Sequence, residues 1–200
     1  MKNFLLLICV IFCCTNANSQ SKELKQKYEK YLSNGVFTIE NDEIIVSRVI
    51  KDIRGDKNSN YIKVKNFFAR KYKDANSVIQ VDDKESGIII GKGYYKDLKS
   101  WVYMMTTYVS FNAYHIVRVD IKDDRVRVIC NASDYDYNPQ GGAYQSVKIV
   151  DYAPVTDKRF IDKGKQTEAF LNLIARMSNT IDEIEDSLKT GIISTENSDW

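Results

Sequence analysis

YVSFNAYHIVRVDI (residues 108–121) and VRVICNASDYDY (residues 126–137) are two neighbouring segments in which apolar and polar residues alternate. Alternation with a period of two is typical of β-strands that bury one face. If the two aspartates between the segments form a two-residue turn, the two apolar faces come into register and Asp120 lies opposite Arg127. Both faces therefore predict the same antiparallel hairpin.

Further strands and two helices are predicted around this hairpin. The periodicities and turn residues indicate strands at 44–53, 78–82, 88–94 and 147–150, and helices at 61–72 and 165–188. Ser59 or Asn60 is positioned to cap the first helix. The sequence thus predicts an α+β fold, in which an antiparallel sheet of about five strands is packed on one face by two helices.

The stretch FFARKYKDANSVIQVDDKESGIIIGKGYY (residues 67–95) resembles an exported bacterial domain of unknown function with a TATA-binding-protein-like fold. The matching elements are an aromatic and basic helix end, a strand, an acidic turn and an apolar strand that ends in Gly-x-Gly: Phe67, Phe68 and Lys71; Val78 to Val81; Lys84, Glu85 and Gly87; Ile88 to Gly93. The resemblance implies this fold over residues 36–190, and export, but no activity. A shape shared with a DNA-binding protein does not transfer DNA binding.

The amino terminus has the pattern of a secretory signal. Lys2 precedes an apolar run from Phe4 to Cys14, and Ala17 and Ser19 follow as small residues. Because the run is too short for a bilayer core of about 30 Å, we expect cleavage and no transmembrane span in the mature chain. The predicted organisation is a signal peptide at 1–19, a polar helical arm at 20–35, a single domain at 36–190 and a flexible tail at 191–200. The expected location is periplasmic or secreted.

Composition excludes several function classes. With 29 basic and 27 acidic residues, the chain offers no electrostatic attraction to nucleic acid. His115 is its only histidine, and Cys130 is the only cysteine outside the predicted signal. Multi-histidine metal sites and internal disulfides are thereby excluded, and the sequence has no complete cofactor signature.

The polar face of the predicted hairpin is the first candidate site. It combines aromatic rings with amides, namely Asn112, Tyr114, Asn131, Tyr135 and Tyr137. Tyrosine offers apolar area together with a polar tip, which suits contact with an envelope protein, a peptide or a glycan. The alternative is structural, because tyrosine also fits the pleat of a sheet.

Cys130 and His115 form the second candidate. In the predicted register they lie diagonally on one face, where a thiol and an imidazole can pair as nucleophile and base. That face is apolar, however, and a buried thiol is usually an inert core residue. The leading hypothesis is therefore a non-catalytic binding module, and the alternative is a small cysteine-dependent hydrolase or transferase.

Asp134, Asp136 and Asn138 have the spacing that opens a calcium loop. Pro139 stands where the loop needs glycine, and Gln145 stands where it needs a bidentate glutamate. We therefore expect a solvated strand end and no metal site.

Two other patterns favour structural roles. Gly91-Lys92-Gly93 lacks the third glycine and the following helix of a phosphate loop, which favours a strand end. The carboxylates of Asp182, Glu183, Glu185 and Asp186 flank the apolar stripe of the last predicted helix, which favours a solvated helix face.

Overall fold

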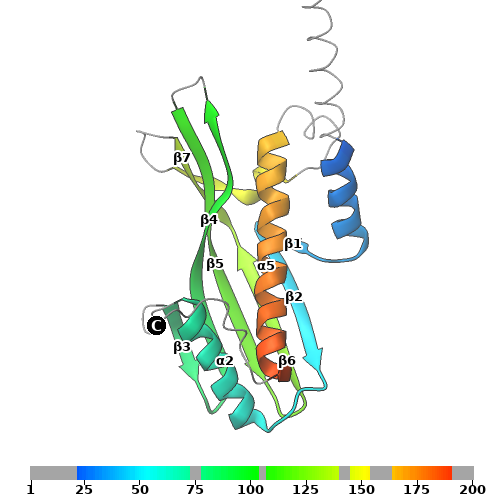
Figure 1. The fold of residues 1–200 in the computed structure, drawn as a ribbon, viewed down its shortest axis with the longest axis vertical. Coiled ribbons are helices and arrows are strands. Elements are labelled where there is room, and N and C mark those ends of the chain that lie inside the picture. Colours follow the sequence, from blue (N-terminus) through cyan, green and yellow to red (C-terminus); the bar gives the residue numbers. More distant parts are fainter. Residues whose placement is uncertain (1–21, 73–77, 104–106, 140–144, 154–163, 191–200) are drawn as a thin grey trace, which may run out of the picture.

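The computed structural model describes residues 22–72, 78–103, 107–139, 145–153 and 164–190 of the chain. These residues form one antiparallel sheet with helices on one of its faces (Figure 1). The predicted signal peptide at 1–19 and the predicted tail at 191–200 lie outside the described residues. The elements are β1 (Thr38–Glu40), β2 (Glu43–Lys51), α2 (Lys57–Lys71), β3 (Ile79–Asp83), β4 (Ile88–Tyr103), β5 (Thr107–Ile121), β6 (Arg125–Ala132), β7 (Asp134–Pro139), β8 (Gln145–Lys148), the 3-10 helix η1 (Ile149–Tyr152) and α5 (Gly164–Thr190).

The strand order is β1-β2-β6-β5-β4-β3, and β7 pairs with both β5 and β8. The predicted α+β class, with an antiparallel sheet covered on one face by helices, is confirmed. The predicted number of about five strands is too low, since the described residues contain eight. One additional strand, β1, is only three residues long, which leaves little periodicity for a sequence pattern to reveal. The other, β7, begins within the predicted segment 126–137, which the structure divides into β6 and β7.

The predicted register of the central hairpin is confirmed. Val119 pairs with Val128, Val117 pairs with Cys130, and Asp120 pairs with Arg127. At the closed end, the Lys122 N–H donates to the Arg125 carbonyl at 3.0 Å. The hairpin is therefore closed by the two aspartates, as the alternation predicts.

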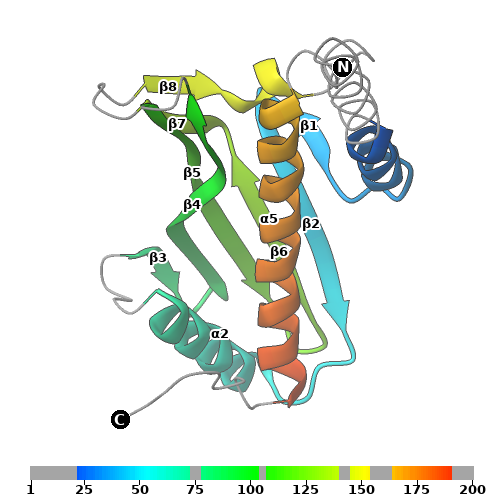
Figure 2. The same ribbon diagram turned by 45° about the horizontal axis from the view of Figure 1, so that its top comes forward.

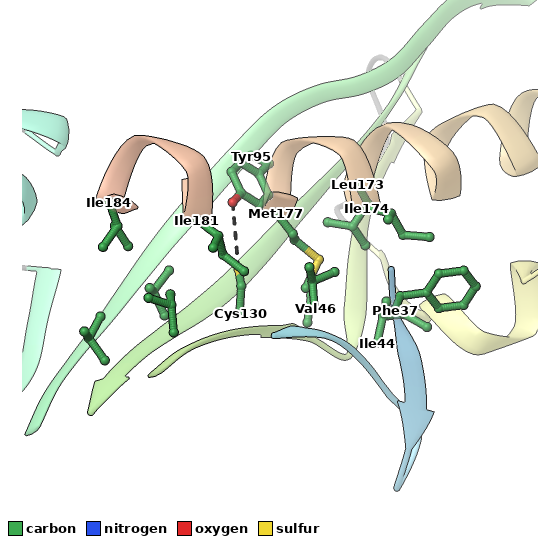
Figure 3. Close-up of a cluster of buried hydrophobic side chains, with 14 of the residues drawn as sticks. Phe37, Ile44, Val46, Tyr95, Cys130, Leu173, Ile174, Met177, Ile181 and Ile184 are labelled. Carbon is green, nitrogen blue, oxygen red and sulfur yellow. Dashed lines mark hydrogen bonds between the residues drawn. The ribbon is translucent and has the colours of Figure 1, made fainter. Parts of the chain in front are cut away.

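Helix α5 lies along the sheet and provides one side of the core (Figure 2). Its apolar residues recur every three or four positions, and those of the stripe are fully buried: Phe170, Leu173, Ile174, Met177, Ile181, Ile184 and Leu188. They face side chains of β2 and β6, including Ile44, Val46 and Cys130 (Figure 3). Among the described residues no helix combines the length and the apolar character of a membrane span.

Helix α2 begins one turn earlier than predicted. Its N-cap is Asp56, whose side chain accepts a hydrogen bond of 2.7 Å from the Ser59 N–H, so neither Ser59 nor Asn60 is the cap. The predicted stripe of Tyr61, Val64 and Phe68 is buried against the sheet. Both helices thus pack on the same face, and the opposite face, called the outer face below, is covered by no helix of the described residues (Figure 1).

The residues predicted as a polar arm contain a helix over 22–33. Leu24, Tyr28 and Tyr31 pack against the core. The Tyr28 ring lies 6.0 Å from the ring of Phe37 and 6.3 Å from that of Phe170. The arm is therefore joined to the domain through apolar contacts.

Candidate functional site

Tyr114 and Asn131 lie on the outer face, as the alternation predicts. The Tyr114 side chain is 51% exposed. Its ring lies 4.6 Å from the ring of Tyr94, and the Lys92 ammonium lies 4.4 Å from its centre. The Asn131 amide donates to the Glu43 carboxylate at 2.6 Å. These two residues present an aromatic ring and an amide on one surface.

Tyr135 and Tyr137 were expected on the same surface, and this expectation is wrong. Tyr135 is fully buried, and Tyr137 packs its ring 5.2 Å from that of Phe111 on the helix-covered face. Ile116 pairs with Asn131, whereas Ala113 pairs with Tyr135, so one extra residue is inserted between β6 and β7. Such a bulge reverses the direction of every following side chain, which carries both tyrosines inward.

Asn112 is only 7% exposed, so it offers little surface for a ligand. Its side-chain oxygen accepts from the Asp97 N–H at 2.8 Å, and its amide nitrogen donates to the Ser110 hydroxyl at 3.3 Å. Asp97 has a positive φ of 52° and lies where the β4–β5 register shifts between Tyr95 and Lys99. Asn112 therefore stabilises an irregularity of β4, a structural role that the alternation does not reveal.

A pocket of about 300 Å³ opens on the outer face where β5 leaves β6 and joins β7. It is lined by Glu43, Lys92, Tyr114, His115, Ile116, Asn131, Ala132, Ser133, Asp134, Asp136 and Ser146. The pocket thus contains the two predicted site residues that remain on this face. The pocket lies at the bulge that turns Tyr135 and Tyr137 inward, between the pairs Ile116–Asn131 and Ala113–Tyr135.

Cys130 and His115 share the helix-covered face, as predicted, but Tyr95 lies between them. The Tyr95 ring stacks on the His115 ring with centres 3.7 Å apart, and the Tyr95 hydroxyl lies 3.9 Å from the Cys130 sulfur (Figure 3). The His115 Nε2 instead meets the Tyr72 hydroxyl at 3.0 Å. Within the described residues no hydrogen bond joins the thiol to the imidazole.

The protonation states also oppose a catalytic pair. Complete burial raises the pKa of the Cys130 thiol to about 12, which keeps the sulfur protonated near neutral pH. Burial, and in second place the nearby Lys71 ammonium, lowers the pKa of His115 to about 3. A neutral thiol and a neutral imidazole without contact do not form an activated nucleophile.

Native protein is expected to react with a thiol reagent at least about 100-fold more slowly than unfolded protein. A pKa higher by about three units lowers the thiolate fraction on the order of 1,000-fold, and burial also blocks access. The measurement compares labelling rates with and without denaturant at one pH. Labelling of the native protein at the unfolded rate would contradict the burial of Cys130 and restore the argument for an enzyme.

Gly91 and Gly93 lie within β4 and make no phosphate loop. A Cβ atom on Gly91 would lie 2.3 Å from the Phe68 ring, and one on Gly93 would lie 2.5 Å from His115 and 2.6 Å from Tyr72. The missing side chains therefore allow the aromatic residues of α2 and β5 to lie directly on the strand. This packing explains the glycine spacing without a ligand.

The structure also shows where the two acidic groups predicted from the sequence lie. Asp134 and Asp136 lie on strand β7, and the side chain of Asn138 lies outside the described residues. No group of three or more potential metal ligands occurs among the described side chains. On α5, the carboxylates of Asp182 and Glu185 pair with Arg48, and Glu183 pairs with Lys71. The exposed acidic face of α5 therefore also joins the helix to β2 and α2.

Comparison with known proteins supports the fold and assigns no activity. Residues 55–135 match the family described as a domain of unknown function (DUF4468) with TBP-like fold. A crystal structure of a TBP-like protein from Parabacteroides distasonis ATCC 8503 has a TM-score of 0.59 at 16% identity, over 76% of this chain and 96% of that chain. A DUF4468 family protein from Bacteroides ovatus ATCC 8483 has a TM-score of 0.57 at 13% identity, over 82% of this chain and 95% of that chain.

No curated protein matches the chain. The β-strands and helix that carry the resemblance in residues 67–95 lie within the matched region. The chain therefore has a TBP-like α+β fold and contains, at residues 55–135, a match to the DUF4468 domain of unknown function.

Proposed function

We propose that this protein is an exported, non-catalytic binding module of the cell envelope, and that the outer face of its sheet contacts the ligand. The supporting observation is an open sheet face with apolar side chains that remain exposed. Tyr114 is 51% exposed, and Ile116 beside it on β5 is 41% exposed. An exposed face of this kind, with an aromatic ring beside a pocket, is typical of an interaction surface.

Export and the absence of catalysis are parts of the same proposal. Export is supported by the pattern of residues 1–19, with its basic start and short apolar run. A non-catalytic role is supported by the burial of Cys130 and by the Tyr95 ring between it and His115. The formal net charge of +2 favours a protein, peptide or glycan ligand over nucleic acid.

Replacing Tyr114 by serine is expected to weaken ligand capture by about 30-fold while leaving the fold intact. Interface energy concentrates in aromatic anchors, whose loss removes about 2 kcal/mol or more of binding free energy. Stability should change by less than about 0.5 kcal/mol, because the ring is on the surface. The measurement is a pull-down from envelope extract, with glycan and peptidoglycan fractions tested in parallel, followed by titration of whatever the parent protein retains.

Ile62→Ser is the matched control for this substitution. Ile62 is 54% exposed on α2, on the opposite side of the sheet, so its loss should leave capture unchanged. Equal capture by the Tyr114 and Ile62 variants would contradict the proposed surface. Turnover of an envelope polymer by the parent protein would favour the alternative, a cysteine-dependent enzyme.

A further inference from the structure

A second pocket, of about 340 Å³, lies at the other end of the outer face. On β5 this pocket is lined by Asp120, which is six residues from Tyr114, a separation of about 20 Å along the strand. The register places Val49 opposite Arg127, and Arg127 opposite Asp120, in one row across β2, β6 and β5. The lining residues are Val49, Lys51, Asp120, Lys122, Arg125 and Arg127.

The charge of this pocket is strongly unbalanced, since four cations and one carboxylate line it. The carboxylate of Asp120 is already shared by two guanidinium groups. It accepts from the Arg118 Nε at 2.8 Å and from the Arg127 Nε and Nη2 at 2.9 and 2.6 Å. Asp120 therefore orients Arg127 at the pocket and has little capacity left to neutralise the other cations.

The remaining cations of the pocket have weak partners or none. In the described part of the chain, the ammonium groups of Lys51 and Lys122 form no ion pair and no side-chain hydrogen bond. Arg125 lies 3.8 Å from the carboxylate of Asp124, whose side chain is 75% exposed. Solvent screens such an exposed pair, so positive charge remains in excess around the hollow.

We propose that this pocket binds a phosphate monoester group, a site that goes beyond the proposed contact surface around Tyr114. A phosphate monoester carries a charge of about −1.5 to −2 and three strong acceptor oxygens, which match several convergent cations better than one carboxylate does. The Arg127 guanidinium uses its Nε and Nη2 on Asp120, so its Nη1 edge faces no carboxylate among the described residues and can donate to phosphate oxygens, and lysines add charge from flexible stems. Val49, 48% exposed at the pocket, offers apolar contact to the group that bears the phosphate.

The linings of the two outer-face pockets carry opposite excess charge, since three carboxylates and Lys92 line one of them, and four cations and Asp120 line the other. The three carboxylates, of Glu43, Asp134 and Asp136, line the pocket around Tyr114. A polyanion that followed the whole face would meet these carboxylates, whereas one phosphate group would contact only the basic end. The charge distribution therefore favours a single phosphate group over the continuous backbone of a nucleic acid.

The test titrates the mature chain with phenyl phosphate and follows the backbone amide signals by NMR. We expect saturable shifts at residues of the pocket, and binding about tenfold weaker in the double variant Lys51→Gln/Lys122→Gln. The matched control is Lys30→Gln/Lys96→Gln, which removes one exposed cation from the helix at 22–33 and one from the register shift of β4, and should leave the affinity within twofold. All four lysines are exposed, so replacing them by neutral glutamine should leave the fold, as followed by circular dichroism, unchanged.

Lipid vesicles distinguish a lipid headgroup from a soluble phosphate, and acetate tests whether negative charge alone is sufficient for binding. Co-sedimentation with phosphatidic acid vesicles, but not with phosphatidylcholine vesicles, would support a lipid headgroup as the source. Binding of phenyl phosphate without vesicle binding would support a soluble phosphate. The proposal is overturned if acetate shifts the same signals with equal affinity, if phenyl phosphate causes no saturable shift, or if both double variants weaken binding equally.

Discussion

Tyr135→Ser is expected to lower the free energy of unfolding by about 3–5 kcal/mol, the range for large aromatic side chains removed from a core. The Tyr135 side chain is fully buried, and its ring lies 5.1 Å from that of Phe111 and 6.3 Å from that of Tyr152. Serine would leave a cavity and bury a hydroxyl in it. Urea unfolding followed by circular dichroism measures the change.

Two other substitutions test whether the loss of stability arises because the Tyr135 ring points into the core. The Tyr135 hydroxyl is buried and has no hydrogen-bond partner among the described residues, so Tyr135→Phe should leave stability unchanged or raise it. Tyr114→Ser, on the exposed side of the neighbouring strand, should change stability by less than about 0.5 kcal/mol. If Tyr135→Ser were as mild as Tyr114→Ser, the ring would be on the surface and the bulge between β6 and β7 would be refuted.

Gly91→Val is expected to destabilise the protein by about 3 kcal/mol or more, at the upper end of overpacking effects. Even a single Cβ atom at this position would lie 2.3 Å from the Cε1 atom and 2.8 Å from the Cδ1 atom of Phe68. Phe68 is fully buried between α2 and the sheet, so the ring cannot turn into solvent. The substitution therefore has to displace α2, and thermal or urea unfolding would report the loss.

A double-mutant cycle assigns this effect to the ring. Phe68→Ala should itself be destabilising, but adding Gly91→Ala to it should cost much less than Gly91→Ala costs in the parent, with a coupling of about 1–3 kcal/mol. Lys92→Ala is the control, because its side chain is exposed on the opposite face of the same strand. Additive effects of Gly91→Ala and Phe68→Ala would show that the ring does not occupy the space above the glycine.

Much of the fold could be predicted from local patterns. Period-two alternation identifies β5 and β6, and opposite charges at Asp120 and Arg127 define their register. The apolar stripe of residues 165–188 identifies α5. These features depend on residues close in sequence and on a single buried face, so the sequence by itself determined the α+β class and the two-residue turn of the central hairpin.

Where the strands are irregular, only the tertiary structure decided which residues reach the surface. A single inserted residue near Ser133 turns Tyr135 into the core and Tyr137 against it, and the largely buried Asn112 bonds to the irregular residue Asp97. In the sequence the insertion is marked only by two consecutive polar residues, Ser133 and Asp134, and tyrosine obscures this mark because its polar tip also suits an outward position. The position of the insertion is determined by the pairing of β7 with β5, from which β6 separates it in the chain, and with the following strand β8.

The two pockets of the outer face also differ in how far their residues could be predicted from the sequence. Tyr114 and Asn131 could be predicted from the hairpin alone, since both belong to the regular part of β5 and β6 or to its edge. The basic pocket could not, because Lys51 comes from β2, which the sequence does not place beside β6. Alternation determines the face on which a side chain lies, whereas strand order, which depends on packing between distant segments, determines which side chains become neighbours.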